Sequence, residues 1–172
     1  MFKKIVAATA LFLTVGVSVV SAKTLVPVPT PSAQLNTFEL FWPMVAGKTV
    51  ESKVYFLKLF KENVREALIF GKPEKADYEV FVATKRLLET ESLLQENKTD
   101  LANKTSDVAI SDLNKAKSNI ESSKESISQD VKNSINQRKE KLEQFLIWLK
   151  TKYSSSVDKL NEVEGAVKAI SL

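Results

Sequence analysis

The chain has 172 residues, of which 44% are hydrophobic and 27% charged, a composition typical of one globular domain. It contains no cysteine, which excludes disulfides, thiolate metal sites, cysteine nucleophiles and a lipid-modified cysteine anchor. It also contains no histidine, and its formal net charge of +4 arises from interspersed acids and bases. Catalytic triads, catalytic zinc sites and nucleic-acid binding are therefore not expected.

Residues 1–22 have the three parts of a secretory signal peptide. Lys3 and Lys4 are followed by an apolar run that starts at Ile5, and small residues precede a cleavage site after Ala22. The apolar run is shorter than the roughly twenty residues of a membrane-spanning helix. We expect an exported, extracytoplasmic protein, either secreted after cleavage or tethered at the cell envelope by an uncleaved signal anchor.

Residues 23–37 form a predicted Pro-rich linker. Pro27, Pro29 and Pro31 alternate with other residues, which favours an extended, polyproline-like spacer. The linker leads into the aromatic lead-in at residues 38–50, which precedes the first predicted helix.

The aromatic lead-in contains Phe38, Phe41 and Trp42, which form the candidate interaction surface of this sequence. Buried aromatic side chains are common, so the favoured interpretation is a plug across the end of a helical bundle. The alternative is an exposed contact for a partner or a membrane surface.

Residues 51–172 predict an all-α, antiparallel bundle of four to five helices. A first helix over residues 51–70 carries an apolar stripe with spacings of three and four residues. Gly71 ends it, and Pro73 suits the first turn of a second helix over residues 73–97. The short connection predicts a tight antiparallel hairpin. The stripe of the first helix comprises Phe56, Leu57, Phe60, Val64, Ala67 and Leu68.

Three further helices are predicted at about residues 106–127, 131–153 and 156–170. The turn before them is assigned to two Asn-Lys-Thr triplets, which begin at Asn97 and Asn103. A near-heptad apolar stripe from Ala109 to Ile170 also fits one long helix in a coiled coil, although separate helices are favoured. Because its apolar residues are small, the segment from residue 103 to 137 is expected to be the mobile side of the bundle.

No motif in the sequence predicts catalysis. Glu89, Glu91 and Glu96 could in principle act as acids or bind a cation, but neighbouring Lys and Arg residues are typical of a solvated polar face. The segment that ends in Gly47-Lys48-Thr49 lacks the first glycine of a phosphate-binding loop, where Trp42 stands. We therefore assign no catalytic, cofactor-binding or metal-binding residues.

The run Tyr55-Phe56-Leu57-Lys58, followed by Pro73-Glu74-Lys75-Ala76 and Arg86-Leu87-Leu88-Glu89, carries a family resemblance. It resembles an uncharacterised domain family of exported bacterial α-helical proteins, in which a Tyr-x-Leu-Lys opening starts a helix that leads into a second helix. The likeness covers roughly residues 41–97, and Lys53-Val54-Tyr55 departs from the usual Pro-Leu-Tyr start. It implies a helical fold and carries no catalytic residues over.

The sequence predicts an exported, non-enzymatic module with a structural or protein-interaction role and an unknown protein partner. Membrane contact is expected only through an uncleaved signal anchor, and the molecule is expected to be a monomer or a coiled-coil dimer. The alternative is a ligand-binding ectodomain of an envelope sensor or transport system, with an apolar ligand in the bundle interior. The interior residues for such a ligand are Phe56, Phe60, Phe81, Phe145 and Trp148.

Overall fold

The computed structural model describes residues 36–172, and helices are the regular secondary structure there. The predicted signal peptide and most of the predicted Pro-rich linker lie outside the described residues. Because residues 36–172 contain helices and no strand, the predicted all-α fold class is confirmed. The elements are α1 (Thr37–Phe41), α2 (Tyr55–Ala67), α3 (Lys72–Gln95), α4 (Thr99–Glu121), η1 (Lys124–Ser126), α5 (Gln129–Lys152), η2 (Ser154–Ser156) and α6 (Val157–Lys168).

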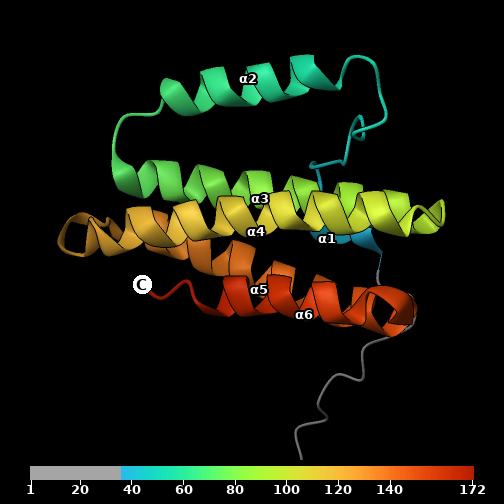
Figure 1. Cartoon of the computed structure of the whole chain (residues 1–172). Coiled ribbons are helices and arrows are strands. Elements are labelled where there is room, and N and C mark those ends of the chain that lie inside the picture. The colour runs from blue at the N-terminus through green and yellow to red at the C-terminus, as the bar shows by residue number, and fades with distance from the viewer. Residues whose placement is uncertain (1–35) are drawn as a thin grey trace, which may run out of the picture. The chain divides into compact units, whose positions relative to one another are not determined.

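Helices α3 to α6 pack around one apolar core, and consecutive helices run in opposite directions (Figure 1). Helix α3 contacts α4 and α5, and α6 contacts the same two helices from the other side. Each fully buried Leu or Phe side chain in such a core contributes roughly 1.5–3 kcal/mol. The largest of these side chains are Leu87, Leu113, Ile120, Ile135, Leu142, Phe145, Leu146, Leu149 and Leu160.

Helix α4 lies against α3 along most of its length, although its apolar residues are small. Ala102, Ala109 and Ala116 are fully buried, and small side chains at a helix contact let the two axes approach closely. The position of α4 between α3 and α6 is therefore central. The mobility of α4 stays a prediction. The weak packing from which we predicted it is not present, because α4 packs closely against α3.

The turn between α3 and α4 is shorter than predicted. Asn97 adopts a positive φ of 58°, and α4 begins at Thr99, so only the first Asn-Lys-Thr triplet is turn structure. The second triplet lies inside α4, and the predicted helix start at residue 106 was wrong. The Thr105 hydroxyl donates to the carbonyl oxygen of Leu101 at 2.8 Å, which satisfies this polar residue within the helix.

Helices α4, α5 and α6 are separate rather than one continuous helix. Helix α4 ends at Glu121, and Ser128 caps α5 by accepting a hydrogen bond from the Val131 amide at 3.4 Å. Tyr153 and η2 then separate α5 from α6. Serine residues thus end and restart helices in a span without proline or glycine.

A short helix, α1, forms where the sequence predicted none. The Asn36 side chain accepts hydrogen bonds from the Phe38 and Glu39 amides at 3.2 and 3.3 Å, which caps this helix. Helix α1 lies against α5. The lead-in therefore reaches the bundle as a helix before it extends toward α2.

Helix α2 is the outermost helix, and of the other helices it contacts mainly α3 (Figure 1). The predicted antiparallel hairpin is present: Gly71 adopts a φ of 101°, and Pro73 lies in the first turn of α3. None of the helices in residues 36–172 is both long and apolar enough to cross a bilayer. The core of α3 to α6 is closed without α2.

Candidate functional site

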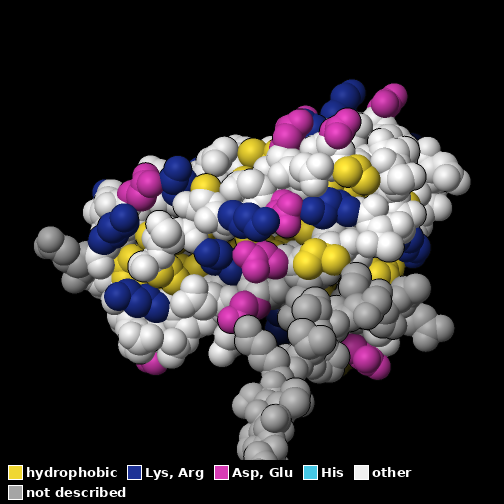
Figure 2. All heavy atoms as spheres, turned by 90° about the horizontal axis from the view of Figure 1, so that it is seen from below, with side chains coloured by type: hydrophobic (Ala, Val, Ile, Leu, Met, Phe, Trp, Pro, Cys, Tyr) yellow, Lys and Arg dark blue, Asp and Glu magenta, His cyan; other side chains and the backbone are white. Residues whose placement is uncertain are grey.

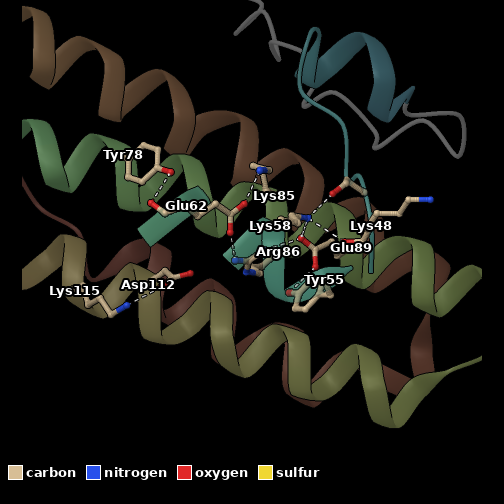
Figure 3. Close-up of polar contacts among 11 residues, drawn as sticks. Lys48, Tyr55, Lys58, Glu62, Tyr78, Lys85, Arg86, Glu89, Asp112 and Lys115 are labelled. Carbon is tan, nitrogen blue, oxygen red and sulfur yellow. Dashed lines mark hydrogen bonds and ion pairs between the residues drawn. The ribbon is translucent and has the colours of Figure 1, made fainter. Parts of the chain in front are cut away.

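The contact between α2 and α3 is a layer of charged and polar side chains (Figure 3). We call these six residues the charge layer: Tyr55, Lys58, Glu62, Lys85, Arg86 and Glu89. Ion pairs of this kind are unusual between helices, which more often meet through apolar side chains. The side of α2 that faces the protein is therefore its polar side.

Glu89 is the fully buried centre of the charge layer, with 0% of its surface exposed. Its carboxylate accepts hydrogen bonds from the Tyr55 hydroxyl at 3.0 Å and from Arg86 Nη1 at 2.8 Å, and it pairs with Lys58. Burial raises the pKa of Tyr55, and the Glu89 charge adds to that, so the hydroxyl stays protonated and donates.

Lys58 joins the lead-in to the charge layer. Its ammonium donates to the carbonyl oxygens of Ala46 at 2.7 Å and Lys48 at 3.2 Å, in addition to its pairing with Glu89. Burial lowers the pKa of Lys58, and Glu89 offsets only part of that shift. One side chain therefore fixes three segments of the chain.

Glu62 forms the second half of the charge layer. It pairs with Arg86 and accepts a hydrogen bond from Lys85 Nζ at 2.6 Å. Burial alone would raise the pKa of Glu62, but the Lys85 hydrogen bond and the Arg86 charge outweigh it and lower that pKa. Both carboxylates of the charge layer, Glu62 and Glu89, thus form ion pairs with neighbouring Lys and Arg side chains, and these pairs hold α2 against α3.

The opposite side of α2 is apolar and points away from the protein. We call Phe56, Leu57, Phe60, Val64 and Leu68 the outer face. Phe56, Phe60 and Leu68 expose 64%, 66% and 67% of their surfaces, and all five residues are classed as exposed. The sequence placed Phe56 and Phe60 of this stripe in the bundle interior, which was wrong, because α3 already uses its apolar side against α4 and α5.

One edge of the outer face is basic. Leu57, Lys61 and Arg65 follow one another at intervals of four residues and line a groove of about 560 Å³ between α2, α3 and the lead-in. Arg65 lies 5.3 Å from the centre of the Tyr78 ring, and no ion pair of Lys61 or Arg65 occurs within residues 36–172. We call this the basic groove; its charged lining residues are Lys48, Lys58, Lys61, Arg65, Lys85 and Glu62.

The other edge of α2 borders an acidic recess of about 250 Å³. There Glu79 accepts hydrogen bonds from Asn119 Nδ2 at 3.0 Å, and Asp112 pairs with Lys115 at 3.1 Å. Burial raises the pKa of Glu79 to about 7 and also raises the pKa of Asp112. Within residues 36–172, no cluster of three or more acidic residues is arranged to hold a metal ion.

The family comparison covers most of this architecture. The model of a domain of unknown function, DUF5667, matches residues 47–165. The chain belongs to the DUF5667 family. The match runs from the basic groove through α2, the charge layer and most of α6, and so extends well beyond the likeness seen in the sequence at residues 41–97. No curated protein and no solved structure matches the chain.

The aromatic candidates precede the DUF5667 match and divide between core and surface. Phe41 is buried with its ring 5.2 Å from that of Phe145, as a plug would be. Phe38 and Trp42 are 53% and 64% exposed and contact each other, with ring centres 4.7 Å apart. Phe41 thus lies where a plug would lie, and the contact of Phe38 and Trp42 with a partner or a membrane surface stays a prediction.

The five residues proposed to line a ligand cavity do not come together in the DUF5667 domain. Phe145 and Trp148 stack 5.9 Å apart at the bundle core, whereas Phe56 and Phe60 lie on the outer face of α2. Phe81 borders the basic groove. The predicted apolar interior site was wrong because α2 turns its stripe outward.

The glutamates assigned to a solvated face also lie elsewhere. Glu89 and Glu91 are buried and only Glu96 is exposed. The Glu62 carboxylate pairs with residues of α3 and not with its helical neighbours Lys58 and Arg65. The sequence does contain one signal of this arrangement. Arg86 and Glu89 are three residues apart, a spacing at which side chains on one side of a helix can pair, and Lys85 directly precedes Arg86.

Proposed function

We propose that this DUF5667 protein is a non-enzymatic interaction module of the cell envelope, which binds through the outer face of α2. One observation carries the proposal: the helix buries its charged side and exposes its apolar side. Soluble domains rarely expose a large contiguous apolar patch, and such a patch marks a site of interaction with a protein or a membrane. The charge layer gives this orientation a physical cause, because it fixes the polar side of α2 to α3.

Export is part of the proposal and rests on residues 1–22. Their signal-like sequence supports an extracytoplasmic protein, secreted or tethered by an uncleaved anchor. The absence of histidine and cysteine supports a role without catalysis. The partner in this proposal is a macromolecule or a membrane surface that covers the outer face of a monomer or a dimer.

A second candidate is the ligand-binding ectodomain of an envelope sensor or transport system. The basic groove favours it, because five cationic residues and two aromatic rings line a space of about 560 Å³. Such a lining suits an anionic ligand with an apolar part rather than a purely apolar one. Native mass spectrometry of the purified protein tests this candidate through a retained small anion.

Photo-crosslinking in intact cells tests the proposed function. A photoreactive phenylalanine analogue replaces Phe60 on the outer face, and the control replaces Ile147, which is exposed on α5. We expect crosslinks from position 60 and few from position 147. We also expect that a protease added outside the cytoplasmic membrane digests the protein. Equal crosslinking at both positions, or a protein that stays inside the cell, contradicts the proposal.

A further inference from the structure

The outer face and the basic edge of α2 form one continuous surface. Leu57 belongs to both, and Lys61 and Arg65 continue along the same edge, where each is exposed. Helix α2 is 13 residues long, so its apolar side chains and its cations can contact the same partner. Any partner of the outer face therefore also meets positive charge.

The sign of that charge narrows the choice of partner. Lys61 and Arg65 are exposed beside the outer face, whereas Glu62 is buried in the charge layer and Glu66 lies toward the acidic recess. A second copy of α2 would bring the same cations to the contact, and like charges repel. An anionic partner instead gains from each of them.

The opposite side of the molecule lacks this bias. There Lys and Arg side chains alternate with Asp and Glu side chains, with hydrophobic side chains scattered among them (Figure 2). Lys150 and Lys168 pair with Glu164, and Lys159 pairs with Asp107 and Glu162. The combination of a large apolar face with uncompensated cations is thus a property of α2.

We propose that the outer face of α2 binds the surface of a bilayer that contains anionic phospholipids. Phe56 and Phe60 enter the boundary between head groups and acyl chains, and Lys61 and Arg65 contact lipid phosphates. This inference rests on the proposed function and names the partner of the same face. It replaces the sequence-based expectation of membrane contact through a signal anchor alone.

The physical requirements of an interfacial helix are met by α2. Such a helix lies in the plane of the interface with aromatic and aliphatic residues on one side and Lys or Arg beside them. Its polar side normally needs water or head groups, but here the charge layer already satisfies it. Helix α2 can therefore dock without refolding.

The absence of cysteine from the chain permits a local measurement on the full-length protein. Ala67, which is exposed at the end of the outer face, is changed to cysteine (Ala67→Cys) and labelled with a polarity-sensitive fluorophore. The matched control is Ile147→Cys on α5. A label at α2 reports contact of this helix even if another part of the chain also binds lipid.

Vesicles of phosphatidylcholine with about one third phosphatidylglycerol, and vesicles of phosphatidylcholine alone, serve as probes. We expect a blue shift at position 67 with the anionic vesicles and none at position 147. Phe60→Ser should raise the lipid concentration at half-shift roughly tenfold. Lys61→Gln and Arg65→Gln should each raise it roughly fivefold, whereas Lys104→Gln on α4 should not.

Three results overturn the lipid assignment. Equal shifts with both kinds of vesicle remove the role of charge, and no shift with either removes the role of lipid. A shift that grows with protein concentration without vesicles shows that a second copy covers the outer face; it also overturns the lipid assignment but leaves the proposed function standing. If crosslinks from position 60 are absent in cells as well, the proposed function fails with it.

Discussion

The two sides of α3 are packed by opposite means. Toward α4 and α5 it buries Leu87 and other aliphatic side chains in a closed core, whereas toward α2 it buries Arg86 and Glu89. Burial of apolar surface contributes stability without regard to orientation, while a buried ion pair costs desolvation and depends on its partners. Apolar burial thus stabilises the bundle of α3 to α6, whereas specific ion pairs hold α2 against α3.

The largest expected effect is the difference in stability loss between substitution of a buried and of an exposed phenylalanine. Phe145→Ala should lower the free energy of unfolding by about 3–5 kcal/mol, because it leaves a cavity in the core. Phe60→Ala should change it by less than about 0.5 kcal/mol, because the side chain is already in water. Urea unfolding followed by circular dichroism measures both, and similar losses would contradict the assignment of α2.

The next effect addresses the charge layer. Glu89→Gln removes the anionic partner of Lys58 and one of the two anionic partners of Arg86, and breaking a buried pair in this way costs about 3 kcal/mol. Because α2 contacts mainly α3, the loss should appear as faster hydrogen exchange in α2, with α4 unchanged. The control, Glu96→Gln, alters an exposed pair and should leave both helices protected. Uniform deprotection of the chain would mean that α2 and the bundle unfold together.

The third effect depends on pH and concerns Glu79, which lines the acidic recess. Its pKa is about 7 in the folded protein against 4.5 for an ordinary glutamate, so the folded state resists ionisation. Stability should therefore fall as pH rises from about 4.5 to 7, by up to about 3 kcal/mol for this group, and then level off. Glu79→Gln should remove that part of the slope, as urea unfolding at pH 5 and pH 8 measures. An unchanged slope would place the carboxylate in a more hydrated setting.

The bundle could be predicted from the sequence because its signals are local. Apolar spacing identifies the helices from Lys72 onward, and Gly71 with Pro73 marks the hairpin turn. The second Asn-Lys-Thr triplet misled the prediction, since the Thr105 hydroxyl bonds within its own helix. Local polarity does not tell whether a residue ends a helix or is satisfied inside it.

The candidate site could not be predicted from the sequence, because both the charge layer and the outer face depend on which side of α2 faces α3. The stripe from Phe56 to Leu68 and the residues Glu62 and Glu89 are visible in the sequence, but periodicity alone gives an apolar side and not its direction. That direction follows from the full use of the apolar side of α3 by other helices. It is a property of the whole packing arrangement.

The junction at Lys58 has a mechanical consequence. A pull on the N-terminal end of the described chain would meet α1 first, then the carbonyl contacts of Ala46 and Lys48 with Lys58, and then α2. The Lys58 contacts and α2 can yield while α3 to α6 keep their core, whereas α1 packs Phe41 into that core. Under tension, the contacts of the lead-in with Lys58 and the packing of α2 would therefore break before the core of α3 to α6.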